Sequence, residues 1–143
     1  MSLKSIVAFA ILLAAYPVFS FERPVRLKNG RQYVKSLSRA LNVSMYDYRP
    51  LFNELKMSLP RSGELSEFYA AKDSMAKLAS FGCDILDFME GPNLNLNTLY
   101  LRILKRSPTE LEKQSVIMKN GRFDVYSNCF VLALHPEFIL IKE

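Results

Sequence analysis

The sequence has few of the residues and motifs on which enzyme active sites depend. It contains one histidine, His135, and two cysteines, Cys83 and Cys129. A histidine-based nucleophile relay needs a serine or cysteine partner and a third orienting group, and the spacing around His135 indicates neither. The cysteines lack a second ligand at zinc-site spacing, and H-E-x-x-H, P-loop and G-x-G-x-x-G motifs are missing. We therefore expect no catalytic residues, no metal and no cofactor.

Long hydrophobic runs are also missing, which argues against a membrane span. The N-terminal apolar run, residues 6–15, follows a single lysine and stops at Pro17. A spanning helix needs ~20 such residues, whereas a cleaved secretory signal needs about 7 to 15. We expect a signal peptide over residues 1–20, cleavage before Phe21, and one domain over residues 21–143. The alternative, a membrane anchor, does not fit so short a run. The protein is thus predicted to be secreted and extracellular.

The residues that are present favour a helical domain with a packed core. Half of them are hydrophobic and 23% are charged. Helical periodicity is clearest over residues 62–90, where one polar stripe lies beside two apolar rows. The rows contain Leu65, Phe68, Met75, Ala79, Cys83 and Leu86, and then Ala71, Leu78, Phe81, Ile85 and Phe88. A helix with two apolar rows lies between neighbours. We predict a mainly α small bundle of about five to six helices around this long central helix, with Ser62 as its N-cap.

Two Asn-Gly pairs leave a choice between helix and hairpin. Asn29-Gly30 either precedes a helix or turns a β-hairpin, and we favour the helix. Asn120-Gly121 lies between β-forming segments, so residues 116–126 could pair as a hairpin. For residues 123–134 we favour a helix. A hairpin at either pair would give an α+β variant of the bundle.

Local signals also place three helix starts. We expect one helix to begin near Tyr48, with Pro50 in its first turn. Asn97 is expected to cap the helix that follows it. Ser107 is expected to cap another, with Pro108 at the first helical position.

The two cysteines predict a disulfide. Cys83 lies in an apolar row of the central helix, and Cys129 lies between Tyr126 and Phe130, which we expect to face that helix. A secreted chain folds in an oxidising compartment, where two such cysteines join when folding brings them together. The alternative is two buried thiols.

Two features of the N-terminal third suggest contacts with other molecules. Asn42-Val43-Ser44 is a glycosylation sequon, which is meaningful in a secreted chain. Basic residues recur nearby and are candidates for binding an anionic surface: Lys28, Arg31, Lys35 and Arg39. The alternatives are a solvated face or one that pairs with the acidic central helix.

These observations favour a binding role. We expect a secreted non-enzymatic interaction protein, of the ligand, effector or inhibitor type, that binds another protein. The alternative is an extracellular carrier that holds a small apolar ligand or lipid in a helical cavity. No specific nucleic acid partner is expected. An open apolar cavity in the structure would favour the carrier.

Overall fold

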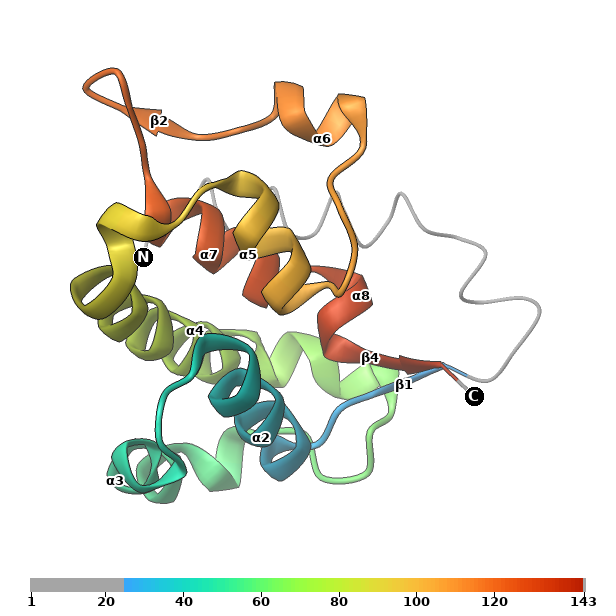
Figure 1. Ribbon diagram of the computed structural model, residues 1–143. Coiled ribbons are helices and arrows are strands. Elements are labelled where there is room, and N and C mark those ends of the chain that lie inside the picture. Colours follow the sequence, from blue (N-terminus) through green and yellow to red (C-terminus); the bar gives the residue numbers. More distant parts are fainter. Residues whose placement is uncertain (1–24, 143) are drawn as a thin grey trace.

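The computed structural model describes residues 25–142, which form a helical bundle around α4 (Phe68–Glu90). Figure 1 shows α2 (Gly30–Leu41) and α3 (Met45–Leu55) below α4, and α5 (Leu96–Ile103) and α7 (Val125–Ala133) above it. Two short helices, α6 (Glu110–Gln114) and α8 (Pro136–Ile139), complete the helical elements of the described range. The predicted mainly α bundle with a long central helix is confirmed. The predicted signal peptide, residues 1–20, lies outside the described residues.

The central helix begins later than predicted, so Ser62 is not its N-cap. It starts at Phe68, after a 3-10 turn over Leu65–Glu67. Gly63 has a positive φ of 82°, and its carbonyl oxygen accepts the N–H of Leu27 at 2.6 Å. Residue 63 is therefore in a left-handed conformation beside the first strand, which a helix that began at Ser62 would not allow.

The two apolar rows of α4 are buried to different extents. The row that contains Met75, Ala79 and Cys83 is fully buried in its middle. The second row is buried at Leu78 but leaves Phe88 87% exposed. The α3 helix covers this row at Phe81, where the Tyr48 ring lies 5.2 Å from the Phe81 ring, and the row continues beyond that contact. The expectation of burial on both rows was thus wrong for the end of the second row, at Phe88, whereas Leu86 of the first row is buried.

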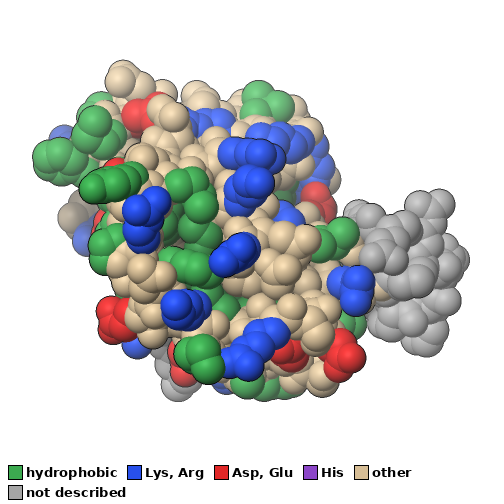
Figure 2. Space-filling model, turned by 90° about the horizontal axis from the view of Figure 1, so that it is seen from below, with side chains coloured by type: hydrophobic (Ala, Val, Ile, Leu, Met, Phe, Trp, Pro, Cys, Tyr) green, Lys and Arg blue, Asp and Glu red, His purple; other side chains and the backbone are tan. Residues whose placement is uncertain are grey.

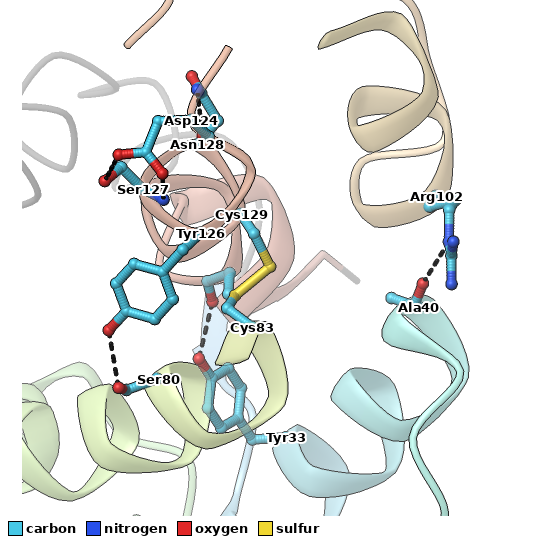
Figure 3. The surroundings of a disulfide bond; sticks show 11 residues. Tyr33, Ala40, Ser80, Cys83, Arg102, Asp124, Tyr126, Ser127, Asn128 and Cys129 are labelled. Atoms are coloured by element: carbon cyan, nitrogen blue, oxygen red, sulfur yellow. Dashed lines mark hydrogen bonds between the residues drawn. A yellow bond between two sulfur atoms is a disulfide. The ribbon is translucent and has the colours of Figure 1, made fainter. Parts of the chain in front are cut away.

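The predicted disulfide between Cys83 and Cys129 is confirmed and joins α4 to α7 (Figure 3). The two Cα atoms lie 5.8 Å apart. Beside it the hydroxyl groups of Ser80 and Tyr126 share a hydrogen bond of 2.7 Å, so Tyr126 does face the central helix. Closing the loop between the cysteines, which are 46 residues apart, stabilises the fold by roughly 4 kcal/mol in the chain-entropy model.

Two short antiparallel pairs accompany the helices. β1 (Val25–Leu27) pairs with β4 (Leu140–Lys142), with Arg26 opposite Ile141. β2 (Met118–Lys119) pairs with β3 (Arg122–Phe123) around Asn120-Gly121. Both turn residues have positive φ, 53° and 75°, which Asn and Gly tolerate and a two-residue hairpin requires. The hairpin and the helix favoured for residues 123–134 therefore coexist, because the helix begins at Val125.

The other Asn-Gly pair begins a helix, as predicted. The Asn29 side chain accepts the N–H of Gln32, and the Gln32 side chain accepts the N–H of Asn29, which closes a capping box. The three other predicted starts were wrong by two or three residues. Ser44 caps α3 and leaves Pro50 inside that helix, Asn95 caps α5, and Thr109 caps α6.

Gly82 gives α3 its close approach to α4. A Cβ atom at this position would overlap the hydroxyl of Tyr48 and lie 2.8 Å from Cδ1 of Leu41. The Tyr48 side chain is fully buried, and its hydroxyl has no hydrogen-bond partner among residues 25–142. Burial also raises the pKa of Tyr48, so this hydroxyl stays neutral.

No helix of the described range is long and apolar enough to span a bilayer.

We predict opposite effects for two substitutions at this contact. Tyr48→Phe removes a buried hydroxyl without a partner and should raise the free energy of unfolding by about 1 kcal/mol. Gly82→Ala should lower it by about 1 to 3 kcal/mol, although alanine favours a helix by ~1 kcal/mol, because the added methyl group cannot fit. The loss should be smaller in the Tyr48→Phe background. Urea unfolding of the four proteins measures this coupling, and a Gly82→Ala variant more stable than wild type would contradict it.

Candidate functional site: a basic groove between α2 and α3

A groove runs along the outer face of α2 and α3. Two adjoining hollows of about 440 and 340 Å³ form it, and both are lined by Arg31 and Phe52. The first hollow is further lined by Val34, Lys35, Met45, Tyr48, Arg49 and Asn53. The second is further lined by Asn29, Gly30, Lys56, Met57, Leu59, Pro60 and Arg61. We call the two hollows together the basic groove.

The groove follows from the amphipathic character of its two helices. α2 buries the side that contains Tyr33, Val34 and Leu37, which leaves Arg31 and Lys35, one turn apart, at its surface. In the first hollow the buried Val34 and Tyr48 form an apolar floor, and Phe52 is half-buried. Figure 2 looks onto this side of the molecule, where Lys and Arg side chains surround hydrophobic ones and acidic side chains lie toward the edges.

The basic side chains of the groove form no ion pairs in the described range. Its lining includes five basic residues and no Asp or Glu: Arg31, Lys35, Arg49, Lys56 and Arg61. None of the five forms an ion pair within residues 25–142. The acidic residues of α3, Asp47 and Glu54, lie on its other side by helical periodicity. The groove therefore presents positive potential above an apolar floor, which suits an anionic partner that also has apolar groups.

The structure brings together two of the four predicted basic residues. Arg31 and Lys35 line the groove, whereas Arg39 is exposed in the last turn of α2 and lines neither hollow. Lys28 lies elsewhere, with its ammonium group 4.4 Å from the centre of the Phe138 ring. Burial lowers the pKa of Lys28 to about 8. No ion pair joins these four basic residues to the central helix in the described range, so the structure does not support the alternative in which the two faces pair.

Sequence reasoning missed the half of the groove that α3 and the following loop provide. Arg49 and Lys56 are seven residues apart, two helical turns, and Met45 and Phe52 repeat at the same spacing. This repeat was the available signal. It could be read only with the correct start of α3, since Met45 and the cap residue Ser44 precede the expected start near Tyr48.

Asn42 lies in the connection between the two helices that form the groove. It is exposed and adopts a left-handed conformation with φ of 56° at the end of α2. The sequon serine, Ser44, accepts the N–H of Tyr46 as the cap of α3. The asparagine side chain is thus accessible to a modifying enzyme, and its glycosylation stays a prediction.

The single histidine has a structural role. His135 is buried, and its Nδ1 accepts the N–H of Glu137 at 3.1 Å, which caps α8. Burial lowers its pKa, so it is neutral at physiological pH. Within residues 25–142 no group of three or more His, Cys, Asp or Glu residues could hold a metal ion.

Comparisons of the chain with protein-family models, with curated proteins and with solved structures found no match. The chemistry of the described residues is therefore what indicates a function.

The Glu67 carboxylate positions the end of the groove that contains Arg61. It accepts the N–H groups of Arg61, Ser62 and Gly63 at 3.0, 3.1 and 3.0 Å, and the Ser62 hydroxyl at 2.7 Å. The hydrogen bond from the Arg61 N–H, followed by that from the Ser62 hydroxyl, lowers the pKa of Glu67 to about 2. The ionised form is therefore the one that holds this loop.

This arrangement predicts a pH dependence of stability. Because the pKa of Glu67 is lower in the folded state, its contribution is complete above about pH 4.5, its ordinary pKa, and is lost as the pH falls toward 2. Glu67→Gln should lower the free energy of unfolding by roughly 1 kcal/mol at neutral pH and remove that part of the acid sensitivity. Urea unfolding between pH 7 and pH 2.5 measures both effects.

Glu64→Gln is the matched control, since within residues 25–142 the Glu64 carboxylate accepts one long hydrogen bond, 3.5 Å from the Ser66 hydroxyl. Equal acid sensitivity in wild type and Glu67→Gln would show that the carboxylate does not hold the loop.

Proposed function

We propose that the protein is a secreted, non-enzymatic interaction protein that binds another protein through the basic groove. The observation that carries this proposal is the combination of two features of the groove. Its five basic side chains form no ion pair in the described range, and they surround apolar side chains that include Tyr48 and Phe52. Interfaces between proteins are enriched in Arg and aromatic residues, and their strongest contacts are apolar anchors seated in pockets.

The shape and chemistry of the groove favour a peptide segment of the partner. The two hollows adjoin along α3, so an extended segment can occupy both. Basic side chains attract carboxylates, while Val34, Tyr48 and Phe52 would receive an apolar side chain. A sulfated polysaccharide or a lipid headgroup would use the charges alone and leave the floor unused. We therefore propose a segment that combines Asp or Glu with an aromatic or aliphatic anchor.

The same lining supports binding over catalysis. It offers cations, amides and apolar groups and contains no Asp, Glu, His or Cys, which are the usual bases and nucleophiles.

Two features support secretion. The Cys83–Cys129 disulfide is of the kind that persists in oxidising compartments, and the sequon asparagine is exposed. Together with the signal sequence expected over residues 1–20, they support a partner that lies outside the cell or on its surface.

We predict that protein from a eukaryotic secretion host begins near Phe21 and carries a glycan on Asn42. The signal peptidase should remove residues 1–20, and the oligosaccharide transferase should reach the exposed sequon. Intact mass measurement checks both, with Asn42→Gln as the control that should lack the glycan mass. A secreted product that retains its N-terminus would contradict the signal peptide.

We also predict that a synthetic peptide rich in Glu and containing Phe binds the secreted protein, and that salt weakens this binding. The Debye length falls from ~10 Å at 0.1 M to ~3 Å at 1 M, which screens the groove cations. The triple variant Arg31→Gln, Lys35→Gln, Arg49→Gln should bind at least about tenfold more weakly. Isothermal titration calorimetry gives the dissociation constants.

The matched control removes the same charge outside the groove, by Arg39→Gln, Lys77→Gln and Lys119→Gln, and should retain binding. An all-Glu peptide of equal charge should bind more weakly, because it lacks the anchor for the apolar floor. Equal losses in the two triple variants would contradict the groove as the site. Tighter binding of heparin or of phosphatidylserine vesicles than of the Phe-containing peptide would contradict a protein partner.

A further inference from the structure

Another hollow, of about 440 Å³, lies outside the basic groove on a different part of the molecule and shares no residue with it. It separates α5 and α7 from the segment of residues 107–123, which we call the strap. Apolar side chains dominate its lining, which consists of Leu96, Tyr100, Leu111, Glu112, Ser115, Ile117, Asn128, Val131, Leu132 and His135.

The middle of the strap crosses this hollow without burying its side chains on the helices beneath it, whereas Pro108 and Phe123 near its two ends are buried or packed against the core. Figure 1 shows α6 and β2 standing above α5 and α7. No residue of α6 is buried, and Leu111, which lines the hollow, is 74% exposed. Across the hollow, Leu96 and Val131 are only half-buried. Apolar side chains on the two sides therefore face one another without closing the space between them.

Polar contacts hold the strap in this raised position at its start. The guanidinium of Arg106 forms two hydrogen bonds to the Glu112 carboxylate, at 2.7 and 2.8 Å, and two to Glu137, at 2.9 and 2.8 Å. The hydrogen bonds from Arg106 are the main cause that lowers the pKa of Glu112 to about 2, so this contact stays charged at physiological pH. The start of the strap is thereby fixed to α8.

The far part of the strap is fixed to α7. The Asn128 side chain accepts the N–H of Ile117 at 3.1 Å and donates to the Ile117 carbonyl oxygen at 2.9 Å. Asp124 donates its own N–H to the same carbonyl at 3.1 Å. With both parts held by polar contacts, the strap cannot close onto α5 and α7 while these contacts persist, although closure would remove apolar surface from water.

The lining also defines the chemistry of an occupant. Its charged side chain at neutral pH, Glu112, is already neutralised by Arg106. Asn128 uses its amide for the strap, and His135 Nδ1 accepts the N–H of Glu137. A charged ligand would thus lose hydration without gaining a counter-ion in this hollow, whereas an uncharged apolar ligand would cover Leu111, Ile117 and Val131. The volume lies within the range of small-molecule sites.

We infer that the hollow beneath the strap is a binding site for a small uncharged apolar molecule, in addition to the protein-binding role proposed for the basic groove. Leu111 and Ile117 contribute the strap side of this site, and Leu96 and Val131 contribute the helix side. The ligand supplies the apolar contacts that the raised strap lacks.

Titration of the full secreted protein with Nile red, an uncharged apolar dye, tests this inference by fluorescence. We expect saturable binding at one site. Leu111→Asp should weaken it by roughly tenfold or more, because it places a charge in the apolar lining. Leu65→Asp is the matched control, since Leu65 is also exposed, at 43%, but lies in the 3-10 turn before α4, and it should bind as wild type does.

A second variant fills the hollow from the rigid side. Val131→Phe adds a ring from α7 and should weaken the dye without placing a charge there. Dodecanol should displace the dye at lower concentration than dodecanoate or dodecylammonium, which have the same chain and opposite charges. Absence of saturable binding, equal binding by wild type and both variants, or equal displacement by the three compounds would overturn the inference. The groove variant Arg31→Gln, Lys35→Gln, Arg49→Gln should bind the dye normally, so failure of one site is distinguishable from failure of the other.

Discussion

The covalent link between α4 and α7 is the constraint on which both candidate sites depend. Cys83 follows Gly82, the residue against which the buried Tyr48 of the groove floor packs. Cys129 follows Asn128, the residue that holds the strap. The buried hydroxyl of Tyr33 connects α2 to α7 as well, since it donates to the carbonyl oxygen of Ala133 at 2.7 Å (Figure 3). The disulfide therefore lies next to residues of both sites: Gly82, which packs against the floor of the basic groove, and Asn128, which holds the strap.

Acidic and basic side chains have different tasks in this chain. Several carboxylates act inside the fold: Glu67 holds the loop before α4, Glu112 and Glu137 hold Arg106, and Glu90 pairs with Arg102 at 2.8 Å. The arginines in these pairs are Arg102, in the last turn of α5, and Arg106, just after that helix. The groove arginines and lysines form no such pairs in the described range. None of these carboxylates pairs with a groove cation, so the positive charge of the groove stays available at the surface.

The sequence predicted the features that follow from helical periodicity or from the oxidising compartment in which a secreted chain folds. Helical spacing located α2, α4 and α7, and two cysteines in a chain expected to be secreted predicted the disulfide. Caps were less predictable because neighbouring signals compete. Ser107 stands three residues before Glu110 just as Thr109 stands before Glu112, so the capping-box rule fits both. In the structure Thr109 and Glu112 form the box, and Glu112 also binds Arg106.

The two candidate sites were predictable to different degrees. Arg31 and Lys35 were found from the period of α2, but the groove also needs residues of α3, whose position beside α2 no local pattern gives. Nothing in the sequence locates the hollow beneath the strap, although an apolar carrier is the alternative function that the sequence allows. It depends on long-range contacts, such as that between Arg106 and Glu137, 31 residues apart.

The pairing of β1 with β4 has a consequence for how the chain reaches this structure. Val25 lies opposite Lys142, so this ladder joins segments that are separated by nearly the whole described range. During synthesis, β1 emerges early and must stay unpaired until residues 140–142 have left the ribosome. Pairings of such high contact order form late and slowly. Until then Leu27, which is buried in the finished fold, exposes apolar surface. Before its own partner segment arrives, this strand is therefore open to association with other chains.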